Sequence, residues 1–261
     1  MHAAVAGALA LVAAVAVGCS GSEPAGVQAS PTVSADPTQA PVGRFETPSE
    51  LGEALTDAAL AAGTARGTLA ARSVDGTVQA ELAYEFDTDA VGIAAEASVV
   101  GPVTVDVGVV QSGDEVYLRV PPIYQLFTSA PWVRVPRGTD TELGQQVDAL
   151  LEALAAEVPG TSLLDLDRRA SDVDLQFLGD DTVATIPVER YEVSATVDDV
   201  VVTRTYWVDD DDLLRRLDTP ADDPAAPEPA LSTATYTEWG VPVIIDAPDP
   251  ADVADLPDGF F

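Results

Sequence analysis

The chain has 261 residues, 47% of them hydrophobic, which is enough to bury one sizeable core and predicts a single folded domain. Its formal net charge of −32 disfavours nucleic acid and anionic membrane surfaces as electrostatic partners, because both repel it. There is no Lys, and the single His and single Cys are His2 and Cys19, so the rest of the chain cannot build a Ser-His-Asp triad, a His-ligated zinc site or a Schiff-base lysine.

The chain starts with an uncharged apolar run from Ala3 to Val17 that ends in Gly18-Cys19. This run is shorter than the roughly 20 residues of a transmembrane helix and is typical of a signal peptide. The alternative is a buried N-terminal helix with a chance Cys. Ala16-Val17-Gly18-Cys19 resembles the lipobox of bacterial lipoproteins, in which the peptide is cut before the Cys and the Cys is acylated. The resemblance implies a signal peptide over residues 1–18 and a lipid anchor on Cys19, at the extracytoplasmic face of the cell membrane.

A flexible tether is expected after the anchor, over residues 19–46. Residues 20 to 46 are rich in Ser, Gly, Pro, Ala and Thr and show no apolar period. A random coil of about 27 residues has an end-to-end distance on the order of 30 Å. Such a tether would hold the folded domain, residues 47–261, clear of the membrane.

The folded domain is predicted to begin with a helix over about residues 48 to 62. Thr47 can cap it, Pro48 suits its first position, Glu50 can close a capping box and Gly63 can end it. The apolar period then changes from 3.6 to 2, which predicts strands with one buried and one exposed face. These strands are expected around residues 66–73, 78–86, 103–109, 116–120 and 132–135, and an Asp75-Gly76 turn joins the first two.

An apolar, aromatic loop is expected at Pro121 to Phe127, because the two prolines at its start disfavour both a helix and a central strand. Such a loop fits the mouth of a cavity or a membrane contact, and it equally fits ordinary packing beside the sheet. The candidate residues for a cavity mouth are Ile123, Tyr124, Leu126 and Phe127.

A second helix is expected from Thr139, where a capping box again precedes an apolar stripe that ends at Pro159-Gly160. The stripe fits either a plain core helix or a lid over a cavity. The candidate lid residues are Leu143, Val147, Leu150, Leu151 and Leu154. A short helix through Leu163 to Leu166 is expected next.

Alternation then resumes, and it predicts strands over residues 191–197, 202–208, 213–217, 231–239 and 241–245. Asp209 to Asp212 could suggest a calcium site, but the spacing is not that of an EF-hand loop, so we predict a solvated hairpin turn there. Residues 218 to 230, rich in Pro and acidic residues, are predicted to form a loop within the domain.

Closely spaced carboxylates occur at Asp165/Asp167 and Asp172/Asp174, as in glycosidases. That chemistry needs two carboxylates across a cleft, and such pairs arise by chance in an acid-rich chain. We therefore predict that the protein is not an enzyme and uses no cofactor or metal. A carboxylate-only hydrolase remains the alternative.

The order of elements, helix then strands then helices then strands, predicts an α+β fold with antiparallel strands. This order resembles the actinobacterial envelope lipoproteins of the LppX/LprG type over about residues 45 to 256. The local phrases that carry the resemblance are Glu115-Val116-Tyr117-Leu118-Arg119, Trp132-Val133-Arg134-Val135, Arg190-Tyr191-Glu192-Val193, Thr205-Tyr206-Trp207-Val208-Asp209 and Tyr236-Thr237-Glu238-Trp239-Gly240.

The resemblance implies a LolA-like fold, a half-open antiparallel β-barrel with helices packed in or over the concave face of a large curved sheet. It also implies a protein that binds or transports a lipid or glycolipid in a hydrophobic cavity, where each buried methylene contributes about 0.8 kcal/mol. The net charge of −32 favours a monomer. The alternative is a structural or regulatory envelope lipoprotein with a filled core, which binds a protein partner through the same fold.

Overall fold

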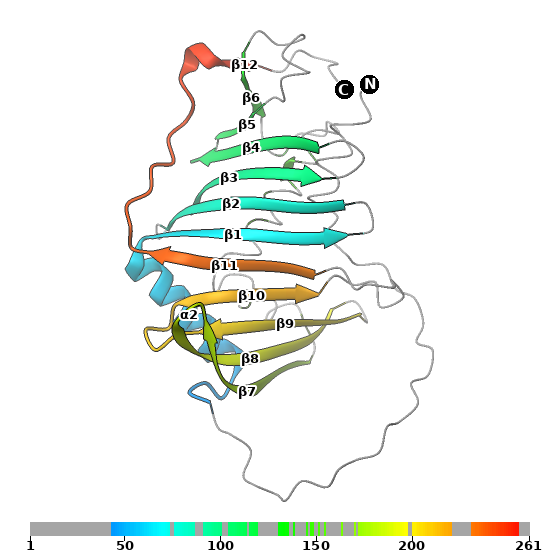
Figure 1. The fold of residues 1–261 in the computed structure, drawn as a ribbon, viewed down its shortest axis with the longest axis vertical. Helices are drawn as coiled ribbons and strands as arrows, with labels where there is room; N and C mark the ends of the chain where they lie inside the picture. The colour runs from blue at the N-terminus through cyan, green and yellow to red at the C-terminus, as the bar shows by residue number, and fades with distance from the viewer. Residues whose placement is uncertain are drawn as a thin grey trace, which may run out of the picture.

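The computed structural model describes residues 43–73, 76–86, 91–100, 104–113, 115–119, 130–135, 172–197, 200–220 and 231–255, and single positions between 138 and 170. These residues form one large, open, curved sheet and one helix with defined bounds, α2 (Pro48–Ala62) (Figure 1). The prediction of several helices packed on the sheet is therefore overstated, because α2 is the one α-helix with defined bounds among the described residues. Within the described ranges, no helix has the length and apolar character needed to cross a bilayer.

The sheet has twelve strands in the order β12-β6-β5-β4-β3-β2-β1-β11-β10-β9-β8-β7. Antiparallel pairing links β1 through β6 in sequence, links β7 through β11 in the same way, and joins the two halves between β1 and β11. The short strand β12 lies parallel to β6. The bounds are β1 (Thr64–Ser73), β2 (Gly76–Phe86), β3 (Val91–Val100), β4 (Thr104–Ser112), β5 (Glu115–Arg119), β6 (Trp132–Val135), β7 (Val173–Val183), β8 (Ile186–Val197), β9 (Val200–Val208), β10 (Leu214–Pro220), β11 (Leu231–Trp239) and β12 (Val253–Asp255).

The period-2 pattern gives the sheet one buried face, which we call the inner face. On β2, Leu82 and Tyr84 are buried on this face, whereas Glu81 and Glu85 are exposed on the opposite, outer face. The buried residues form one apolar cluster that reaches from β5 and β6 across the sheet to β8. The predicted large curved antiparallel sheet is thereby confirmed.

Helix α2 confirms the capping signals in the sequence. Thr47 Oγ1 accepts a hydrogen bond from the Glu50 N–H at 3.2 Å, Glu50 Oε2 accepts one from the Thr47 N–H at 3.2 Å, and Gly63 ends the helix at φ 74°. Leu51, Leu55 and the alanine at position 59 bury one side of α2 in the core. The helix contacts β1 and β7, and Figure 1 shows it crossing the lower half of the sheet, on the side away from the viewer.

The expected strand over residues 241–245 is wrong. After β11 the chain leaves the sheet at Gly240, where φ is 69°, and Pro242 has no N–H to donate to a ladder. Residues 241–249 instead run as an irregular strap past the strand ends to the short helix η1 (Pro250–Asp252) and β12 (Figure 1, orange to red).

The strap is attached to the sheet at few points. Thr64 Oγ1 donates a hydrogen bond to the Val241 carbonyl at 2.8 Å. Ile245 is 8% exposed, and its Cδ1 lies 3.6 Å from where a Cβ on Gly92 would stand, on the outer face of β3. Ile244, in contrast, is 82% exposed.

Candidate functional site

The candidate site is the inner face together with the segments that cover it. Four aromatic side chains from β2 and β11 meet there across the intervening strand β1. Tyr84 and Phe86 stack with ring centroids 5.9 Å apart, Phe86 and Trp239 stack at 5.9 Å, and Tyr236 lies 5.5 Å from Trp239. The side chains of Tyr84 and Tyr236 are nearly completely buried, so this cluster forms part of the core.

Gly67 on β1 allows the close approach that this cluster needs. The register shifts between Arg66 and Gly67 where β1 pairs with β11. A Cβ on Gly67 would stand 2.4 Å from the Thr235 carbonyl oxygen, which no side chain can occupy without a backbone shift. The glycine thus brings the β11 backbone against β1 beneath the aromatic rings.

Three of the five candidate lid residues lie in this core. Val147, Leu151 and Leu154 have helical backbone and are at most 3% exposed. The Tyr84 hydroxyl donates a hydrogen bond to the Leu154 carbonyl at 3.5 Å, which places this helical segment at the inner face of β2. Leu163, also helical, belongs to the same cluster.

The other candidate residues lie outside the described part of the chain. They are Cys19, Ile123, Tyr124, Leu126, Phe127, Leu143 and Leu150.

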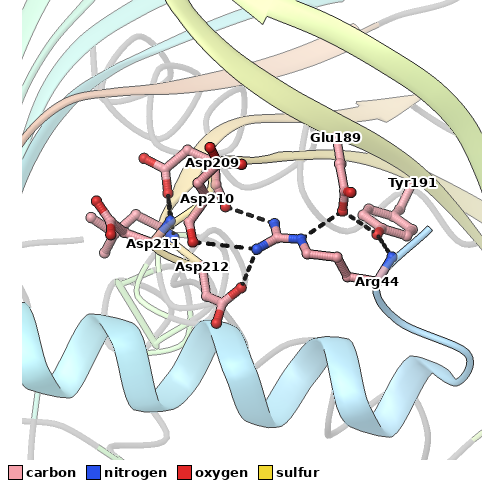
Figure 2. A network of polar contacts seen from close by, with 8 residues as sticks. Arg44, Glu189, Tyr191, Asp209, Asp210, Asp211 and Asp212 are labelled. Carbon is pink, nitrogen blue, oxygen red and sulfur yellow. Dashed lines mark hydrogen bonds and ion pairs between the residues drawn. The ribbon is translucent and has the colours of Figure 1, made fainter.

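A polar network holds the segment before α2 against β8 and the turn between β9 and β10 (Figure 2). Arg44 Nε donates to Glu189 Oε2 at 2.7 Å, and its Nη1 donates to Asp212 Oδ1 at 2.9 Å. Arg44 Nη2 donates to the Asp209 carbonyl at 2.7 Å, and the Arg44 backbone N–H donates to the Tyr191 hydroxyl at 2.8 Å. The guanidinium therefore joins β8 to the turn between β9 and β10.

The charges in this network stabilise one another. Burial raises the pKa of Tyr191 to about 12, and the hydrogen bond that its hydroxyl donates to Glu189 acts in the same direction. Burial acts to raise the pKa of Glu189, but the hydrogen bonds from Tyr191 and Arg44 outweigh it, so this pKa lies below its ordinary value of 4.5. Burial acts to lower the pKa of Arg44, yet the hydrogen bond and charge of Glu189 raise it overall, which keeps the guanidinium charged.

The turn at Asp209 to Asp212 confirms the hairpin and shows what its carboxylates do. Asp209 is 4% exposed; its Oδ1 accepts from the Asp211 and Leu213 N–H groups at 3.0 and 2.9 Å, and its Oδ2 accepts from Arg215 Nε at 2.6 Å. These contacts close the turn and partner Arg215. Asp209 is therefore not solvated as expected. Among the described residues, no group of His, Cys, Asp and Glu is arranged to hold a metal ion.

The role of Arg44 was not found from the sequence, which placed it in the tether. One signal was present: Arg44 is the first cationic residue of the chain, and a large aromatic residue, Phe45, follows it in a stretch of mostly small residues. Its partners are about 145 residues or more away in the sequence, so no local pattern indicates them.

No family model matches the chain, and no curated protein matches it significantly. Among solved structures, the chain is similar to the Mycobacterium tuberculosis lipoprotein LppX, with 16% identity, a TM-score of 0.44, and 76% of this chain and 98% of that one covered. It is also similar to the Pseudomonas aeruginosa MucA/MucB complex, with 14% identity, a TM-score of 0.41, and 74% and 56% coverage. A putative outer membrane lipoprotein-sorting protein domain from Vibrio parahaemolyticus shows 11% identity, a TM-score of 0.25, and 73% and 90% coverage.

Proposed function

We propose that the protein is an envelope lipoprotein, anchored through an acylated Cys19, that binds the acyl chains of a lipid or glycolipid at the inner face of its sheet. The anchor rests on the lipobox-like sequence Ala16-Val17-Gly18-Cys19 after an apolar run too short to span a bilayer. The proposal includes no chemical step, so transfer of the lipid would need only that the cover over the inner face opens.

The observation that carries the proposal is the width of the apolar inner face. The buried cluster reaches across ten adjacent strands, from Val135 on β6 to Val193 on β8. Neighbouring strands are about 4.8 Å apart, so this face extends roughly 43 Å across the sheet. Helix α2, with 15 residues, is about 22 Å long and covers about half of that width.

Near β2, the described residues that cover the face belong to the helical segment of Val147, Leu151 and Leu154. If this segment moves away, the strands beneath it keep their ladders, because each strand pairs with strands of the sheet rather than with the segment. An acyl chain could then take the place of its side chains, gaining about 0.8 kcal/mol for each methylene that it buries.

The near-complete burial of Val147, Leu151 and Leu154 also favours a second candidate. Side chains packed this closely are what a filled core contains, and a protein with a filled core would act by binding another protein. The two candidates differ in whether space for a lipid exists between the sheet and its cover.

Two adjacent alanines on β3 distinguish the candidates. Ala95 is buried on the inner face, whereas Ala94 is half-buried on the outer face and serves as the matched control. If the inner face holds a lipid, Ala95→Leu folds normally and reduces the lipid recovered from the purified chain by solvent extraction and mass spectrometry. If the core is filled, the same change overpacks it and lowers the free energy of unfolding by about 1–3 kcal/mol.

The acyl groups on Cys19 would be covalently attached, so solvent extraction removes only bound lipid. Ala94→Leu should leave both the lipid content and the unfolding free energy unchanged. Absence of any co-purifying lipid from the wild-type chain, together with a stoichiometric membrane protein recovered with it, contradicts lipid binding and supports the second candidate.

A further inference from the structure

Residues Gly43–Phe45, which we call the latch, belong to the last part of the expected tether, just before α2. Phe45 contacts Tyr191 with ring centroids 5.4 Å apart, and Tyr191 contacts Phe177 at 5.3 Å. Phe177 and Tyr191 are register partners on β7 and β8, and both belong to the inner face or pack against its cluster. The latch therefore covers an aromatic pair at the β7 end of the inner face.

Gly43 fits against this pair without space for a side chain. A Cβ at position 43 would stand 2.6 Å from the Tyr191 hydroxyl and 2.8 Å from Phe177 Cδ2. A Cβ atom cannot lie this close to other heavy atoms, so replacing Gly43 by any other residue must displace the latch or the two rings. The latch is thus positioned both by its shape at Gly43 and by the polar contacts of Arg44.

The two ion pairs of Arg44 lie at the protein surface. Its side chain is 33% exposed, and the carboxylates of Glu189 and Asp212 are 21% and 40% exposed. Exposed ion pairs contribute little to stability and are screened by salt. The latch can therefore release far more often than the sheet unfolds, as local segments with few buried contacts do.

Release of the latch does not require α2 to unwind. The capping box between Thr47 and Glu50 satisfies the first backbone N–H groups of the helix within the helix itself. Leu51 and Leu55 keep α2 on the sheet independently of Phe45. The boundary between the releasable segment and the fixed helix thus falls at residue 46.

We propose that the latch gates an acyl-chain subsite. When the hydrogen bonds and ion pairs of Arg44 break, Phe45 leaves the Phe177–Tyr191 pair and the end of a lipid acyl chain takes its place. This inference rests on the proposed lipid binding and adds where one end of the ligand lies. Because the latch continues directly into the tether that leads to Cys19, the opening lies at the point where the membrane anchor joins the domain.

Two variants and one control test the gate in the mature chain acylated on Cys19, reconstituted in phosphatidylcholine vesicles. Arg44→Gln removes both ion pairs, and Gly43→Ala displaces the latch without changing its charge. Arg66→Gln is the control, since it removes one exposed ion pair, with Glu238, far from the latch. The probe is a phosphatidylcholine with a pyrene on one acyl chain, and its uptake is followed by pyrene fluorescence.

We expect both latch variants to take up the probe about tenfold faster than the wild type, the effect of losing about 1.4 kcal/mol from a few surface contacts. The control should take it up at the wild-type rate. Hydrogen exchange of residues 43–46 provides a second readout that needs no variant. In the wild-type protein loaded with probe, the Arg44 amide should lose the protection that its bond to Tyr191 gives.

The outcomes separate the gate from the proposed function. If the wild type takes up the probe, but both variants do so at its rate and residues 43–46 stay protected in the loaded protein, the gate is wrong while lipid binding stands. If neither the wild type nor the variants take up the probe, lipid binding is wrong and the gate with it. If one variant fails to fold, judged by its thermal melt, the other variant and the exchange measurement give the answer.

Discussion

Asp209 shows how a single residue organises the turn between β9 and β10. Its carboxylate closes the turn through two backbone N–H groups and pairs with Arg215, whose side chain is 13% exposed. Its carbonyl accepts from Arg44. One residue thus connects the hairpin, a neighbouring cation and the latch.

Asp209→Asn should therefore be strongly destabilising. Asn can still accept the backbone hydrogen bonds, but it leaves the nearly buried Arg215 without its charge partner, which typically costs about 3–5 kcal/mol. Urea denaturation measures the change. Asp210→Asn, at an exposed position in the same turn, should stay within about 0.5 kcal/mol of the wild type. Equal losses from the two variants would contradict the role of Asp209.

The Glu189–Tyr191 pair gives stability a pH dependence at both extremes. The pKa of Glu189 is lowered, so its contribution is present above its unfolded value near 4.5 and is lost as the pH falls through the lower, folded value. The pKa of Tyr191 is raised to about 12, so its contribution is present below about pH 10 and is lost as the pH rises toward 12. Arg44 forms an ion pair with Glu189, and the same guanidinium pairs with Asp212.

Glu189→Gln should consequently lower the unfolding free energy at pH 7 and have a much smaller effect near pH 3. The measurement is the free energy of unfolding of both proteins across this range. A difference between the two proteins that stays constant from pH 7 to pH 3 would show that the Glu189 charge does not stabilise the fold.

At the scale of elements, β12 and the strap protect one edge of the sheet. β12 pairs with β6, and Arg134 on β6 donates from Nε and Nη2 to Asp255 Oδ1 at 2.9 and 2.6 Å. Without β12, β6 would present its N–H and C=O groups to solvent on that side. An exposed strand edge of this kind can pair with another chain.

A chain that stops after Gly240 should therefore self-associate, because it lacks both the strap and β12. Sedimentation velocity measures the association, and a chain that stops after Asp255 is the matched control. We expect the shorter chain to form dimers or larger species in a concentration-dependent way while the control behaves as the full chain does. A monomeric shorter chain would show that β12 does not protect the edge.

Most of the elements that the sequence predicted carry a clear local signal. Helix α2 and strand β2 were predicted because the capping box and the alternation of Leu82 and Tyr84 with acidic residues are local signals. β3 was missed because its inner position Ala95 and its outer position Ala94 are the same residue type. β7 was missed although its inner positions Val173, Leu175 and Phe177 alternate with polar residues.

The strap and the latch show two ways in which local patterns mislead: one predicts a strand that does not form, and the other hides long-range contacts. Val241 and Ile244 are apolar, so the sequence predicts a strand there, but both are exposed and lie outside the sheet. The sequence places Arg44 in the tether, because its partners lie in β8 and in the turn before β10, which no periodicity connects to it. Of the candidate lid residues, Val147, Leu151 and Leu154 lie at the inner face, and whether they cover a lipid stays a prediction.

For the whole molecule, the net charge of −32 implies self-repulsion in the folded state. The range of this repulsion falls with salt, since the Debye length is about 30 Å at 0.01 M and about 10 Å at 0.1 M. We expect the melting temperature to rise when NaCl is increased between these concentrations at pH 7. Near pH 4, where many carboxylates are neutral, the same change should have little effect; an equal rise at both pH values would contradict the role of charge.

The position of β1 and β11 in the middle of the sheet determines the order in which the strands can pair while the chain is being made. β1 through β6 are contiguous in the chain and can form their meander as soon as they are made, whereas β1 finds its second neighbour only when β11 is complete. Pairings as distant in sequence as Ala65 with Trp239 slow folding, because a long loop must close before the contacts form. Until β11 is added, the first half of the protein carries an open strand edge at what becomes the centre of the sheet, and this is the stage at which the nascent chain most needs protection from aggregation.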